Sequence, residues 1–77
     1  MKLQPVYLEW VDPQSVDAWT DLAEVRVDRL PLIRSVGLVV SETRDMLVIA
    51  QNYDKKNDQV SMVMHIPLVN IKKLTKL

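Results

Sequence analysis

The sequence predicts an all-β protein, a small five-stranded antiparallel barrel with one short helix between its first two strands. Twelve Val and four Ile among 77 residues favour strands, because β-branched side chains pack well on pleated surfaces. Several short segments alternate apolar and polar residues, as half-buried strands do. Five short expected strands in so short a chain, most joined by hairpins, are typical of a small closed sheet. We expect a single domain over residues 1–77. The alternative arrangement is an open α+β sheet with the helix across one face.

The first strand is expected over residues 6–11. Val6, Leu8 and Trp10 occupy every second position there, which places them on one face of a strand. We expect the face that carries Leu8 and Trp10 to point into the core.

A helix of about three turns is expected over residues 14–25. Asp12 suits its N-cap and Pro13 its first helical position. The apolar residues of this segment fall at spacings of three and four: Val16, Trp19, Leu22 and Ala23. A helix this short is marginally stable alone, so we expect Trp19 and Leu22 to dock it onto the sheet.

The next two strands are expected over residues 32–41 and 46–50, joined by a polar turn at 42–45. The first has apolar residues on both faces, which predicts a central and strongly curved strand. Gly37 within it predicts a bulge or a tight bend. The second is apolar throughout, which predicts burial and completes a hairpin.

A polar loop is expected over residues 52–59, followed by the clearest strand of the chain over 60–66. The residues expected to face inward are Val60, Met62, Met64 and Ile66, and those expected outward are Ser61, Val63 and His65. Pro67 ends this strand, and residues 68–70 are expected to form a single tight turn. Residues 71–77 form either a short closing strand or a helical tail.

The composition offers no set of residues for catalysis. The absence of Cys excludes disulfides, thiolate metal sites and a Cys nucleophile, and the single Gly excludes a phosphate-binding Gly-rich loop. The lone His65 is interpreted as a solvated strand residue rather than as part of a triad. Asp17, Asp21 and Glu24 have helical spacing, which is typical of a solvated helix face. We therefore expect no enzymatic activity and no cofactor.

Residues 54–58 carry two carboxylates and Asn57 but do not make a metal loop. They lack the Gly and the distal Glu of a calcium-binding loop. Lys55 and Lys56 would also repel a cation. We expect no metal site here.

Charge is balanced overall but unevenly distributed, with ten basic and ten acidic residues. Residues 1–24 are acidic and residues 46–77 are basic. The basic segments fit three interpretations: contact with the phosphates of a nucleic acid, contact with the acidic helix of a neighbouring copy in a head-to-tail assembly, or simple solubility. The candidate interaction surface consists of Tyr53, Lys55, Lys56, Lys72, Lys73 and Lys76.

No targeting or membrane-spanning segment is expected. A polar Gln4 and Pro5 follow the start at once, unlike the apolar region of a signal peptide. The longest apolar stretches, residues 36–40 and 46–50, are far shorter than the roughly 20 residues that span a bilayer. We expect a cytoplasmic protein without membrane contact.

Four segments resemble short bacteriophage or prophage proteins of uncharacterised function. They are Tyr7-Leu8-Glu9-Trp10-Val11-Asp12, the segment around Trp19, Ser35-Val36-Gly37-Leu38-Val39, and Ile66-Pro67-Leu68-Val69-Asn70-Ile71. The arrangement is similar to SH3-like or Sm-like small barrels, in which a tight turn after the fourth strand leads into the fifth. This resemblance implies an SH3-like barrel and carries over no functional residue, because the family has no assigned active site. The early helix departs from many such barrels.

These features predict a non-enzymatic protein-interaction or assembly module of phage or prophage type. The expected partner is a protein, either another copy in a homo-oligomer or a larger protein. Nucleic acid is the alternative partner, since small barrels often bind it. A phage-encoded module would act in the cytoplasm of the bacterial host or within the virion.

Overall fold

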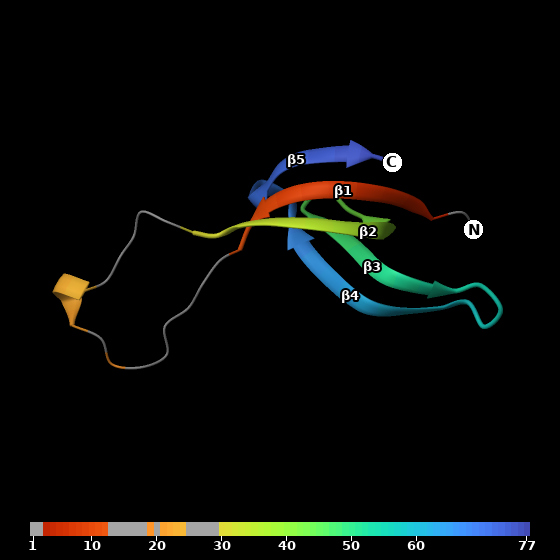
Figure 1. Ribbon diagram of the computed structural model, residues 1–77, viewed down its shortest axis with the longest axis horizontal. Coiled ribbons are helices and arrows are strands. Elements are labelled where there is room, and N and C mark those ends of the chain that lie inside the picture. The colour runs from red at the N-terminus through yellow and green to blue at the C-terminus, as the bar shows by residue number, and fades with distance from the viewer. Residues whose placement is uncertain (1–2, 13–18, 20, 25–29) are drawn as a thin grey trace.

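The computed structural model describes residues 3–12, 19, 21–24 and 30–77, which contain one sheet and two short 3-10 segments (Figure 1). The strands are β1 (Gln4–Val11), β2 (Leu32–Glu42), β3 (Met46–Asp54), β4 (Gln59–Pro67) and β5 (Ile71–Lys76). The turns are the 3-10 segments η1 (Leu22–Glu24), between β1 and β2, and η2 (Leu68–Asn70), between β4 and β5. The all-β prediction is confirmed for these residues.

The strand order in the sheet is β4-β3-β2-β1-β5, and all four neighbouring pairs are antiparallel. β1 lies inside the sheet, so that Tyr7 faces Val36 of β2 on one side and Thr75 of β5 on the other. β4 and β5 are its two edges. No pairing joins these edges in the part of the chain that the structure describes, so the sheet is open and the predicted barrel closure is not found.

The core lies on one face of this sheet. Its buried side chains come from three strands: Val6, Leu8 and Trp10 of β1, Leu47 and Ile49 of β3, and Ile66 of β4. The inward face predicted for β1 is confirmed. The indole Nε1–H of Trp10 donates to Ser35 Oγ at 3.0 Å, so the one polar atom of this side chain has a partner.

Gly37 of β2 is buried and packs closely against β3. A Cβ on Gly37 would lie 3.0 Å from Ile49 Cδ1 and 3.2 Å from the backbone oxygen of Ala50. The irregularity predicted at Gly37 falls three residues later, where the pairing with β3 shifts register between Val39 and Ser41. Gly37 therefore serves close packing rather than a bulge.

The helix predicted over residues 14–25 is not found among the residues described there, which contain only the turn η1. Residues 14–18, 20 and 25 of that prediction lie outside the described residues. The predicted docking is wrong, because the side chains of Trp19 and Leu22 are 104% and 90% exposed. Helical spacing alone does not stabilise so short a helix, and no sheet residue packs on these two side chains to do so. The α+β alternative required the same helix.

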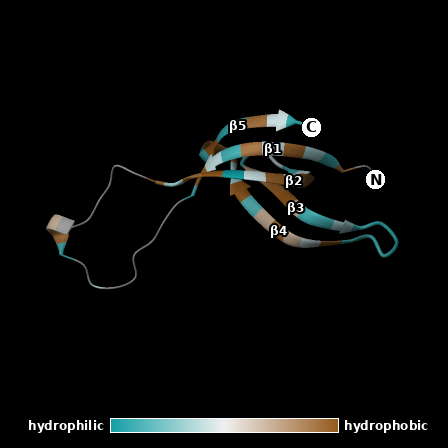
Figure 2. Ribbon diagram, viewed as in Figure 1, coloured by the Kyte–Doolittle hydropathy of each residue, from teal (hydrophilic) through white to brown (hydrophobic). Residues whose placement is uncertain are grey.

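β3 and β4 extend further than the sequence predicts. Asn52 and Asp54, expected in a loop, pair with Ser61 and Gln59 of β4, and only residues 55–58 form the turn. Figure 2 shows this turn as hydrophilic throughout. Polar residues carry no alternating pattern, yet their backbones continue the ladder of hydrogen bonds that the apolar part of the hairpin begins.

Half of the inward set predicted for β4 is wrong. Ile66 is buried and Met64 half-buried, but Val60 and Met62 are 38% and 69% exposed. This end of the hairpin extends past the core, so its alternating side chains have no facing layer. Met62 also has a backbone φ of 57°, which interrupts the regular ladder.

The remaining predictions for the C-terminal part hold. Residues 68–70 form the tight turn η2, and Pro67 precedes it. Residues 71–76 form a strand rather than a helical tail, since β5 pairs along β1.

Candidate interaction surfaces

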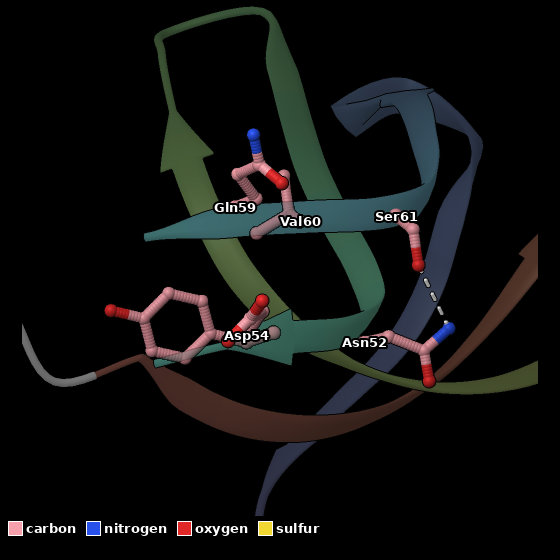
Figure 3. Close-up of a pocket in the computed structure, with 6 residues that line it drawn as sticks. Asn52, Asp54, Gln59, Val60 and Ser61 are labelled. Atoms are coloured by element: carbon pink, nitrogen blue, oxygen red, sulfur yellow. Dashed lines mark hydrogen bonds between the residues drawn. The ribbon is translucent and has the colours of Figure 1, made fainter. Parts of the chain in front are cut away.

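The far end of the β3–β4 hairpin holds a shallow, open hollow of about 240 Å³ (Figure 3). Six residues line it: Asn52, Tyr53, Asp54, Gln59, Val60 and Ser61. Asn52 Nδ2 donates to Ser61 Oγ at 3.1 Å, which joins the two strands across the hollow. Its lining residues are exposed apart from the half-buried Tyr53, so the hollow does not exclude water.

Asp54 holds the turn of this hairpin. Its Oδ1 accepts from the backbone N–H of Lys56 at 3.0 Å, and its Oδ2 accepts from Asn57 Nδ2 at 2.8 Å. The hydrogen bond from the Asn57 side chain is the main reason why the pKa of Asp54 is lowered. The carboxylate is thus committed to the turn. The described residues contain no group of three or more His, Asp or Glu placed to hold a metal ion.

Tyr53 is also tied to this turn. Its hydroxyl donates to Asp58 Oδ1 at 2.9 Å, and this hydrogen bond raises the pKa of Tyr53. Asp58 has a backbone φ of 53°, a conformation that Asp tolerates better than most residues. Tyr53 therefore stabilises the hairpin and offers a partner chain only part of its ring.

The structure divides the candidate residues between two places. Tyr53, Lys55 and Lys56 lie at the hairpin end, beside the β4 edge of the sheet. Lys72, Lys73 and Lys76 lie on β5, at the opposite edge. The two lysine groups form two surfaces rather than the single surface predicted from the sequence.

The β5 edge is basic and partly apolar. Lys72, Lys73 and Lys76 are exposed, and Leu74 and Leu77 beside them are 41% and 63% exposed. The ion pairs found among the described residues involve Arg34 and Arg44, not these lysines. Like charges along an edge strand repel a second copy of the same edge.

The β4 edge has the opposite character. Residues 59–67 contain no Asp, Glu, Lys or Arg. Val60, Met62 and Val63 are exposed along it, and Val63 is 43% exposed. Pro67 ends the strand. Before it, the positive φ of Met62 is the one departure from extended backbone. An uncharged edge strand is open to pairing with another chain.

The face of the sheet opposite the core carries a polar group around Glu9. Tyr7 donates its hydroxyl hydrogen to Glu9 Oε2 at 2.5 Å, and Arg34 Nε lies 3.7 Å from the same oxygen. The hydrogen bond to Glu9 raises the pKa of Tyr7. His65 is exposed on β4, as predicted, and lies opposite Val48.

Sequence reasoning missed two of these features. The exposed pair Trp19 and Leu22 was assigned to the core, because an amphipathic pattern does not reveal whether its apolar face is covered. The β4 edge did have a signal, since no charged residue occurs between Asp58 and Lys72. That signal becomes informative only when the strand order places β4 at an edge.

The chain matches no protein-family model, no curated protein and no solved structure. No helix within the described part of the chain is both long enough and apolar enough to cross a membrane. The function is therefore inferred from the surfaces described above.

Proposed function

We propose that this chain is a non-enzymatic protein-interaction or assembly module of phage or prophage type. It acts in the cytoplasm of a bacterial host or within the virion. The observation that carries the proposal is the β4 edge, an exposed strand without a charged residue over Gln59–Pro67. Such an edge adds a strand from another chain through backbone hydrogen bonds.

A second copy is a suitable partner for this edge. Two β4 edges pair without bringing like charges together, and the contact is self-complementary, as a two-fold dimer requires. The β5 edge does not pair with itself in this way, because three lysines would face three lysines. A strand from a larger protein meets β4 by the same chemistry.

The test is the mass of the protein in solution, measured by sedimentation from about micromolar to about millimolar concentration. We expect the wild type to associate within this range. The Val63→Lys variant should associate only at a protein concentration about tenfold higher or more, because a lysine on an edge strand opposes pairing. Val36→Lys is the matched control, since Val36 is 54% exposed but lies on β2, inside the sheet. A wild type that stays monomeric throughout and recovers no partner from host lysate would overturn the proposal. Equal association of the two variants would overturn the role of β4.

Nucleic acid is the second candidate partner, favoured by the three exposed lysines of β5. Binding of this kind weakens steeply with salt, because cations are released from the phosphates. A mobility-shift titration with single-stranded and duplex oligonucleotides at low salt tests it. A shift that disappears in Lys72→Glu, Lys73→Glu and persists in Val63→Lys would favour nucleic acid over assembly.

We also propose that the open sheet is of the SH3-like or Sm-like kind. The turn η2 leading directly from β4 into β5 supports this. Backbone amide contacts between β4 and β5 in solution would establish closure, and their absence would leave an open sheet.

A further inference from the structure

The connection between β1 and β2 presents two apolar side chains to solvent. Trp19 is 104% exposed and Leu22 is 90% exposed. Figure 1 shows η1 well away from the sheet, and we call Trp19 and Asp21–Glu24 the arm. The hydrogen bond from the backbone N–H of Asp12 to Pro31 O, at 3.1 Å, closes the base of the connection. A Trp and a Leu this close together and this exposed are the side chains that anchor protein–protein contacts when a partner covers them.

The arm lies in the acidic part of the sequence. The thirteen residues from Asp12 to Glu24 include four acidic residues and no basic one. A partner that buries Trp19 and Leu22 must therefore also meet negative charge. The most favourable surface is basic at its rim and partly apolar at its centre.

The β5 edge carries both kinds of side chain. Three exposed lysines and the exposed Leu74 and Leu77 lie within residues 72–77, which contain no acidic residue. Glu9, the acidic residue opposite Lys73, already accepts from Tyr7 and lies near Arg34. None of the ion pairs found among the described residues involves a β5 lysine, so these lysines are available to an outside carboxylate.

We propose that the arm of one copy docks on the β5 edge of a second copy. Trp19 and Leu22 straddle the edge strand, against Leu74 on its core side and Leu77 on the opposite side, and Asp21 and Glu24 of the arm meet the lysines of β5. The contact is head-to-tail. In a pair of copies, one keeps its arm free and the other keeps its β5 edge free, so further copies add until the assembly is a ring or a filament. This inference rests on the proposed assembly function and adds a contact that does not use β4.

The contact joins copies rather than folding the arm back onto its own β5. Asn70 Nδ2 donates to Val11 O at 3.0 Å, which fixes the start of β5 beside the base of the connection. With its base fixed there, the arm still leaves both apolar side chains fully exposed. Trp19 and Leu22 thus do not lie on their own β5, which leaves that edge open to the arm of a second copy.

The experiment uses the Val63→Lys background, in which pairing at β4 is removed. The first variant adds Trp19→Ala and Leu22→Ala, and the second adds Lys72→Glu and Lys73→Glu. Alone, each should need about tenfold or more higher concentration than the background to associate, because each lacks one half of the contact. Mixed, they should form 1:1 complexes and nothing larger, since one supplies the only intact arm and the other the only intact β5 edge.

The matched control is Lys55→Glu, Lys56→Glu in the same background, which makes the same charge change at the hairpin turn. It should associate like the background. Circular dichroism checks that every variant retains its strands. A background that associates while the mixed variants stay monomeric overturns the inference and leaves the assembly function in place. An equal loss of association in the hairpin control also overturns the inference, because the overall change in net charge would then explain the effect.

A Val63→Lys background that stays monomeric also distinguishes the proposed assembly function from the head-to-tail contact. If the wild type associates and the Val63→Lys background does not associate at any concentration, the β4 edge alone carries assembly and the head-to-tail contact is wrong. If the wild type is monomeric as well, the proposed function itself fails.

Discussion

Gly37 packs so closely against β3 that an added Cβ would be crowded. Its nearest neighbours would be the Ile49 side chain at 3.0 Å and the backbone oxygen of Ala50 at 3.2 Å. The side chain has some freedom to move, but the oxygen belongs to the β3 backbone. A methyl group at Gly37 therefore requires the Ile49 side chain and the β3 backbone to shift slightly.

Gly37→Ala should lower the free energy of unfolding by about 1–3 kcal/mol, the usual cost of overpacking a core. Urea denaturation followed by Trp10 and Trp19 fluorescence measures it. Val36→Ala is the control, because Val36 is the neighbouring residue, more than half exposed, and should cost less. Equal unfolding midpoints for Gly37→Ala and the wild type would contradict the close approach of β3.

The hydroxyl of Tyr7 should titrate above the usual tyrosine pKa of about 10, mainly because it donates to Glu9. Tyr53→Phe leaves Tyr7 as the only tyrosine, so the ultraviolet absorbance of the phenolate reports it alone. Adding Glu9→Gln should lower this pKa towards its ordinary value. Because the folded pKa is raised, the stability from this bond is present below pH about 10 and is lost as pH rises through the folded pKa. An unchanged titration in the Glu9→Gln variant would contradict the contact.

At the scale of elements, the turn of the β3–β4 hairpin depends on one carboxylate. Asp54 accepts hydrogen bonds from the backbone of Lys56 and the side chain of Asn57. This arrangement lets polar residues continue the hairpin beyond the apolar core. The turn and the strands beyond the core are thus held by local hydrogen bonds rather than by burial.

Asp54→Ala should loosen the hairpin end without unfolding the core. Amide hydrogen exchange of Lys56 and Asn57 should become faster, while the amides of Leu47 and Ile49 stay protected. Low pH should have the same effect, because the lowered pKa of Asp54 means that its contribution is lost as pH falls through the folded value. Asp45→Ala, on the β2–β3 turn, is the control. Unchanged exchange at Lys56 would show that Asp54 does not hold the turn.

The spacing of apolar residues made most elements predictable from the sequence. Alternation identified β1 and its inward face, and punctuation by Pro67 identified the η2 turn. The same logic failed at Trp19, Val60 and Met62, because a pattern shows which residues share a face and not whether another layer covers that face. The extended ends of β3 and β4 were missed because their polar residues are held by pairing, which leaves no trace in hydropathy.

The candidate surface was predictable residue by residue but not as an arrangement. The lysines of β5 and of the hairpin turn are exposed, as basic residues in polar segments should be. Their separation onto opposite edges follows from the strand order β4-β3-β2-β1-β5. Strand order depends on which distant segments pair, and no local signal in this sequence specifies it.

At the scale of the whole molecule, the protein combines a small core with extended parts. The hydrophobic core cluster lies on one face of a single sheet. The radius of gyration is 15.7 Å, against about 11 Å for a compact chain of this length. No disulfide supports the fold, since the chain has no Cys. A domain of this size has little stability of its own, so a partner that binds only the folded state would contribute a large share.

The thermal midpoint should therefore rise with protein concentration. Association of the folded state adds about 2.7 kcal/mol at a hundredfold excess of partner over Kd, and each kcal/mol raises the midpoint of such a domain by about 4–8 °C. Thermal unfolding followed by circular dichroism, over about a hundredfold range of wild-type concentration, measures this rise. The variant combining Val63→Lys, Trp19→Ala and Leu22→Ala should melt at one temperature throughout, because it lacks both contacts. Its midpoint should match that of the dilute wild type, since Trp19 and Leu22 lie outside the core. A wild-type midpoint independent of concentration would show that the core alone supplies the stability and that the exposed edges and arm contribute nothing to it.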